Sequence, residues 1–175
     1  MDATEHSLYS SYREALLEHL LVGELMRHMW VRGLGRLEVL QTQVDDSGYD
    51  LVLEARSVIR HVQIKATFRG SRTQRFNVNI ALSTKPSGCV VVVLFHPETL
   101  AIGPFWWFGA PPGEPLPSLD EFLIAKHTKG NAQGVKLSRP NIRVLPWAAM
   151  DELDSIEALC NRLFGPLSQQ PLQPT

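Results

Sequence analysis

The stretch "GYDLVLEARSVIRHVQIKAT", Gly48 to Thr67, predicts a β-hairpin at the centre of the fold. Two runs rich in Val, Ile and Leu, residues 51–54 and 58–66, have the composition of β-strands. A turn at Arg56 and Ser57 joins them, although these residues do not form the Asn-Gly or Asp-Gly pair that strongly favours a two-residue hairpin turn.

Three polar residues are set into this apolar hairpin. Asp50 begins the first strand, and Gln63 and Lys65 stand near the middle of the second. The expected turn places Asp50 opposite Gln63, and because side chains alternate along a strand, all three then share one face. A slip of one residue would break this arrangement. A polar cluster inside a hairpin that needs a core indicates a functional site, since unpaired polar groups are costly to bury.

The helix that precedes the hairpin carries a second anomaly. We expect one helix from Leu8 to Val31, ended by Gly33. At about 100° per residue, Glu24 lies near the middle of an apolar stripe, with His28 beside it; the stripe is formed by Leu17, Leu20, Leu21 and Val31. A salt-bridged or snorkelling glutamate is the simpler interpretation. Its coincidence with Asp50 and Lys65 favours one shared site.

The remaining chain predicts a single α/β domain over residues 1–166, with a mixed central β-sheet flanked by helices. Strands are expected at residues 37–44, 76–82, 89–95, 100–108 and 142–146, and helices at 119–127 and 151–164. The run "CVVVVLF" is typical of a central strand covered on both faces. Trp106 and Trp107 cannot face the same side of a strand, so one of them is expected at the edge of the core or as a stacking surface. The Pro- and Gln-rich tail, residues 167–175, is expected to be disordered.

Net charge and cysteine content restrict the cell compartment and the binding partners that we expect for this protein. The net charge of −1 gives no global attraction to DNA or to a membrane, so a nucleic acid would need a local basic patch. The candidates are Arg69, Arg72 and Arg75 in one loop and Lys126 and Lys129 in another, with solvated loops as the alternative. Cys89 and Cys160 stand in apolar runs and are expected to be buried free thiols, as in a reducing, cytoplasmic compartment. Neither a secretory signal nor a membrane span is expected.

Metal-dependent cleavage of a phosphodiester accounts for the polar residues together. Mg²⁺ binds through one or two carboxylates and keeps several waters and substrate oxygens. Asp50 is the expected fixed ligand, Gln63 a weaker amide ligand, and the main-chain carbonyl of Ile64 a further one. Glu24 supplies the missing charge directly or through water. Lys65 is expected to orient the attacking water and to stabilise the developing negative charge.

These residues resemble the PD-(D/E)xK nuclease superfamily. "GYD" is followed 13 residues later by "QIK", after a helix that carries "GE" at Gly23 and Glu24. The resemblance covers residues 16–95 and implies a restriction-endonuclease-like core. It assigns the motif aspartate to Asp50, the acidic ligand position to Gln63, the lysine to Lys65 and the helix glutamate to Glu24. Gln at the acidic position is similar to Mrr-like members. The family core also has a helix where "RFNVNIALSTKPSG" leaves room for only a strand and one helical turn.

The expectation is therefore a Mg²⁺- or Mn²⁺-dependent endonuclease that acts on DNA, or on RNA, with no membrane partner. A chain with one site cuts both strands of a duplex only as a dimer or in two events, which favours a homodimer. The alternative is a non-catalytic nucleic-acid-binding or protein-interaction module on the same fold. Gln63 and the near-neutral net charge favour that alternative, whereas Asp50, Lys65 and Glu24 favour an enzyme.

Overall fold

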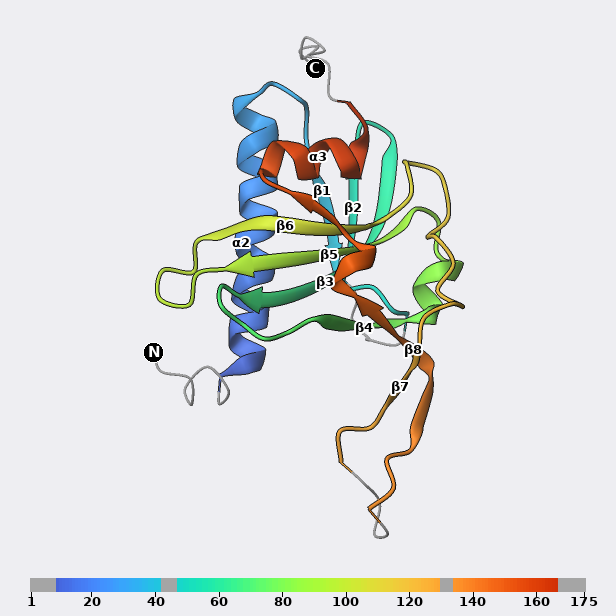
Figure 1. The fold of residues 1–175 in the computed structure, drawn as a ribbon. Helices are drawn as coiled ribbons and strands as arrows, with labels where there is room; N and C mark the ends of the chain where they lie inside the picture. Colours follow the sequence, from blue (N-terminus) through green and yellow to red (C-terminus); the bar gives the residue numbers. More distant parts are fainter. Residues whose placement is uncertain (1–8, 42–46, 130–133, 167–175) are drawn as a thin grey trace.

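The computed structural model describes residues 9–41, 47–129 and 134–166, which form two β-sheets with flanking helices (Figure 1). The predicted α/β class with a mixed central sheet is therefore confirmed. In chain order the elements are α2 (Ser10–Val31), β1 (Glu38–Gln41), β2 (Leu51–Ala55), β3 (Val58–Phe68), β4 (Arg75–Asn79), η1 (Ile80–Thr84), β5 (Gly88–Phe95), β6 (Ile102–Gly109), β7 (Ile124–Lys126), β8 (Ser138–Pro146), η2 (Trp147–Ala149), β9 (Asp151–Leu153) and α3 (Ile156–Phe164).

The larger sheet has six strands in the order β1-β2-β3-β5-β6-β9. Its β3 and β5 are parallel, and every other neighbouring pair is antiparallel. The connection between the two parallel strands passes through β4 and the short 3₁₀ helix η1. The smaller sheet, in the order β4-β8-β7, is antiparallel throughout.

The hairpin formed by β2 and β3 has the predicted register. Leu51 pairs with Val62, and Ala55 pairs with Val58. Arg56 and Ser57 form the turn with φ values of 53° and 65°. Positive φ at both central residues is the type I′ geometry, whose twist matches that of the flanking strands. The twist of the strands therefore stabilises this turn even though Arg56 and Ser57 are not the Asn-Gly or Asp-Gly pair that usually forms it.

The six-stranded sheet is covered on both faces. One face of β5 packs with α2 and α3 through Cys89 and Val91, while Val90 and Val92 face the smaller sheet. The expectation that one of the two tryptophans would lie at an edge is wrong, because Trp107 and Trp106 enter the cores on opposite faces with 2% and 9% exposure. The predicted doubly covered central strand is confirmed.

The buried ridge of α2 differs from the predicted stripe. Its members are four residues apart and less than 2% exposed: Leu17, Leu21, Leu25 and Met29. Val31, which helped to define the predicted stripe, is 69% exposed. At about 100° per residue the true ridge is centred roughly 75° from the predicted one. The end of the helix is as expected, at Val31, with Gly33 following at φ 64°.

Two predicted helices need correction. Residues 119–127 form a turn and then β7, because the Leu123 carbonyl accepts from the Val144 N–H at 2.8 Å and an isolated helix this short is marginal. The helix expected from residue 151 begins only at Ile156, where the hydroxyl of Ser155 caps it and β9 precedes it. Of the strand expected at 76–82, β4 ends at Asn79, and η1 follows as the single helical turn that the sequence left room for.

Some expectations fall outside the described residues: the first turn of the N-terminal helix at Leu8, the strand continuation at 42–44 and the tail at 167–175. Cys89 and Cys160 are buried free thiols, as predicted, and burial raises the pKa of each to about 12. Among the helices of the described ranges, none has the length and apolarity needed to cross a membrane.

Candidate functional site

Asp50 is held at the edge of β3 by a short hydrogen bond. The pairing of β2 with β3 ends at Leu51 and Val62, so β3 continues past the start of β2. There the backbone N–H of Ile64 donates to Asp50 Oδ2 at 2.6 Å. Because the N–H and C=O of one strand residue face the same side, the Ile64 carbonyl also faces this edge.

The residues before Asp50 fit closely against the neighbouring connection. Gly48 is buried with φ 78°, and a Cβ there would lie 3.0 Å from the backbone nitrogen of Leu82 in η1. Only glycine combines this backbone conformation with so close an approach. The Tyr49 ring meets the His61 ring of β3 edge to face, with centroids 4.8 Å apart. The segment "GYD" is thus fixed by contacts with both η1 and β3.

Asp50, Ile64 and Lys65 line one cleft of about 450 Å³, here called the Asp50 cleft. Its other walls come from the N-terminal half of α2 and from β4, through Arg13, Glu14, Leu17, Glu18 and Phe76. Asp50 and Lys65 are both half-buried. The structure therefore brings together three of the residues singled out in the hairpin, at a point where a helix, a strand edge and the smaller sheet meet.

Gln63 does not line the Asp50 cleft. Its side chain is 5% exposed, and its Oε1 has no hydrogen-bond partner within the described part of the chain. In the sheet it is paired with Val90 of β5, in the strand whose Val90 and Val92 face the smaller sheet. A buried amide oxygen without a partner is costly, so Gln63 remains an anomaly next to the cleft.

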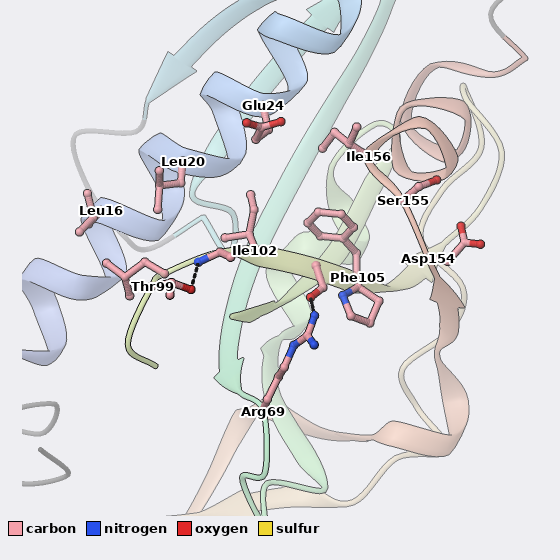
Figure 2. A pocket seen from close by; sticks show the side chains of 14 residues that line it. Leu16, Leu20, Glu24, Arg69, Thr99, Ile102, Phe105, Asp154, Ser155 and Ile156 are labelled. Atoms are coloured by element: carbon pink, nitrogen blue, oxygen red, sulfur yellow. Dashed lines mark hydrogen bonds between the residues drawn. The ribbon is translucent and has the colours of Figure 1, made fainter. Parts of the chain in front are cut away.

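Glu24 does not lie with Asp50 and Lys65 in the structure. It lines a different cavity, of about 750 Å³, which Figure 2 shows with Glu24 on α2 and with Arg69 and Phe105 on the side of the sheets. Its carboxylate forms an ion pair with Arg27 of the next turn at 2.7 Å. The expected placement of Glu24 depended on the predicted stripe, and the shifted ridge of α2 directs it away from the Asp50 cleft.

The same shift explains two glutamates that the sequence reading missed. Glu14 and Glu18 line the Asp50 cleft, and Gln41 of β1 donates to Glu18 Oε1 at 2.5 Å. Each lies three residues before a member of the buried ridge, Leu17 or Leu21, and so points to the sheet side. Reading the ridge from the four-residue spacing of Leu17, Leu21, Leu25 and Met29 would have found both.

The five predicted nucleic-acid contacts lie outside the Asp50 cleft. Arg69 is exposed, and its guanidinium donates to the Gly103 carbonyl at 2.9 Å. Arg72 is exposed in the connection between β3 and β4, and Arg75 is the exposed first residue of β4. Lys126 ends β7, and Lys129 lies just beyond it, both exposed.

Comparison with known proteins assigns no family. No family model matches the chain, and no curated protein matches it. The chain is similar to one solved structure, a bacterial homing endonuclease named I-Ssp6803I, at 17% identity with a TM-score of 0.30, over 78% of this chain and 88% of that one. At this TM-score the two folds agree only loosely, so the likeness assigns no function to this chain.

Proposed function

We propose that this chain is a divalent-metal-dependent endonuclease that hydrolyses phosphodiester bonds in DNA, with the Asp50 cleft as its active site. The observation that carries the proposal is the position of Asp50, whose carboxylate is fixed on the edge of β3 in one cleft with Lys65. The Asp50 carboxylate, directly before β2, and the Lys65 amine, on β3, share this half-buried cleft next to strands that build the core. They are the groups that metal-assisted phosphodiester cleavage uses.

The donor set of the cleft fits a hard cation such as Mg²⁺ or Mn²⁺. Mg²⁺ is usually held by one or two carboxylates and keeps several waters. Asp50 would be one ligand, the Ile64 carbonyl another, and Glu14 or Glu18 would add a second carboxylate, directly or through water. Among the described residues, no three His, Cys, Asp or Glu side chains converge as a full protein cage. A bound cation would supply a water of lowered pKa and a counter-charge for the phosphate.

The other groups of the cleft have roles that follow from their charges. Lys65 would hold a non-bridging phosphate oxygen and orient the attacking water, and its positive charge would stabilise the charge that develops at phosphorus. Glu14 and Glu18, on the opposite wall, would accept hydrogen bonds from that water. Arg72 and Arg75 would contact phosphates outside the cleft, since such contacts supply most of the affinity of proteins for DNA.

A second candidate function follows from Gln63. In the superfamily that the sequence resembles, this strand position holds an acidic metal ligand. Here the Gln63 amide brings no charge and does not line the cleft, so the cleft lacks that ligand. A chain that binds nucleic acid or a protein without cutting would tolerate that loss. This candidate differs from the first in one measurable respect, because it predicts binding without turnover.

Nicking of supercoiled plasmid DNA separates the two candidates. In Mg²⁺ the wild-type chain should convert supercoiled plasmid to open circles, and chelation of the metal should stop it. Asp50→Asn keeps the shape and the acceptor for the Ile64 N–H but removes the charge, so it should nick at least about 100-fold more slowly. Asp154→Asn, at an exposed residue outside the Asp50 cleft, is the matched control. Equal nicking by wild type and Asp50→Asn would refute the proposal.

A further inference from the structure

A two-stranded ribbon extends from the smaller sheet. We call it the β7–β8 arm and define it as residues 123–129 and 134–141. Strand β4 pairs with β8 only from Ile142 onward, so the first part of β8 is paired with β7 alone. In Figure 1 this part of the chain extends away from the six-stranded sheet.

The charged residues of the arm are all basic. Between Phe122 and Met150 the sequence contains no Asp or Glu, although the whole chain carries a net charge of −1. The described part of the arm holds four cations: Lys126, Lys129, Lys136 and Arg139. The three lysines are exposed. A projecting surface with cations and without carboxylates favours a polyanion as its partner over an ordinary protein surface.

Apolar side chains accompany these cations along the arm and are also exposed. Leu123 is 74% exposed, Val135 56% and Leu137 57%. The major groove of duplex DNA admits a two-stranded β-ribbon, and there the apolar side chains would contact sugars and thymine methyl groups while the lysines contact phosphates. The combination of ribbon shape, exposed cations and interleaved apolar residues fits such a groove.

The arm is connected directly to the Asp50 cleft through one strand. Phe76 of β4 lines the cleft, and it pairs with Leu145 of β8, the strand that continues into the arm. Arg75, the residue before Phe76, is exposed on the same strand. A duplex held by the arm would therefore be held by the element that also forms a wall of the proposed active site.

We infer that the β7–β8 arm binds the groove and phosphates of double-stranded DNA and so positions a duplex for the Asp50 cleft. The inference rests on the proposed function for its choice of partner. It adds to that function the class of substrate, a duplex, and the element that recognises it. The binding step needs no metal, so it can be tested apart from cleavage.

The test is fluorescence anisotropy with a labelled DNA duplex in EDTA, where no cleavage occurs. The full-length variant Lys126→Ala with Lys136→Ala should bind the duplex about tenfold more weakly than wild type, and the slope of log affinity against log salt should fall by about two. The control variant, Arg27→Ala with Arg36→Ala, also removes two positive charges. These two exposed arginines lie in the C-terminal half of α2 and just after the helix, outside the arm, so the control should bind like wild type.

Each result supports or overturns the inference. It is overturned if wild type does not bind duplex, if both double variants weaken binding equally, or if the arm variant loses only single-stranded DNA or anionic lipid vesicles. Retained duplex binding by the arm variant, together with Mg²⁺-dependent nicking by wild type, overturns the arm and leaves the proposed function standing. Arm-dependent duplex binding by a wild type that never nicks supports the arm and refutes the proposed function.

Discussion

Asp50 and Gln63 show how the fold treats two polar residues at the open end of the hairpin. The carboxylate of Asp50 accepts the Ile64 N–H at 2.6 Å and remains half-buried in its cleft. Gln63 is buried with an amide oxygen that has no partner in the described ranges. The first residue stays partly accessible in its cleft, and the second occupies a position at which a charge would be costly unless a cation compensated it.

Substitution of Gln63 by Glu measures that compensation. In EDTA, Gln63→Glu should lower the free energy of unfolding by roughly 3 kcal/mol, because it buries an uncompensated carboxylate. If a cation binds near this position, saturating Mg²⁺ should restore about 2–3 kcal/mol by binding the folded state alone. Urea unfolding with and without Mg²⁺ gives both values. A variant that Mg²⁺ does not stabilise more than wild type would show that position 63 is remote from any metal.

Glu18 and Glu24 of α2 form a contrasting pair of glutamates. Glu18 lines the Asp50 cleft, and Glu24 lines the other cavity and pairs with Arg27. Glu18→Gln should therefore reduce nicking about tenfold or more, while Glu24→Gln should leave it unchanged. Initial rates on supercoiled plasmid, measured at equal folded fraction, compare the two. If Glu24→Gln slowed nicking and Glu18→Gln did not, Glu24 would belong to the active site, as the predicted apolar stripe suggested.

The elements differ in how far their sequences determine them. The β2–β3 hairpin was predicted with its register because alternation and turn position are local signals. The buried face of α2 was predicted with the wrong phase, because several leucines offered two overlapping stripes and only packing against the sheet distinguishes them. The helix expected at 119–127 failed for a similar reason: pairing with β8, more than ten residues away in sequence, supplied its backbone hydrogen bonds.

Arg60 is an element-scale contact that the strand pattern did not reveal. Its fully buried guanidinium donates to the Leu163 carbonyl at 2.6 Å, to Arg162 at 2.9 Å and to Ala110 at 3.0 Å, and burial lowers its pKa. It thereby fastens the C-terminal end of α3 to β3, where a cation is also favoured by the helix dipole.

Arg60→Met should lower the free energy of unfolding by about 3 kcal/mol, because three carbonyls, one in a buried hydrogen bond and two in partly buried ones, lose their donor. The exposed control Arg36→Met should change it by less than about 0.5 kcal/mol. Chemical denaturation of both variants and wild type gives the comparison. A loss below about 1 kcal/mol in Arg60→Met would mean that these carbonyls find other donors.

On the scale of the whole molecule, the proposed site exists only because three elements meet. Lys65 lies on β3 and Asp50 directly before β2, bonded to the edge of β3, while α2 provides one wall and β4 of the smaller sheet another. The hairpin residues could be selected from sequence because they break a local pattern. The walls could not be, since β4 reaches the cleft through pairing with β8, more than sixty residues later in the chain.

The cleavage activity of Lys65→Ala tests the central claim most directly. Nicking of supercoiled plasmid in Mg²⁺ is measured for wild type, Lys65→Ala and the exposed-cation control Arg36→Ala, with each rate divided by the folded fraction from circular dichroism. If Lys65 stabilises charge in the reaction, Lys65→Ala should be slower by about 100-fold or more per folded molecule, and Arg36→Ala should match wild type. If Lys65→Ala nicks DNA as fast as wild type, the Asp50 cleft is not the active site.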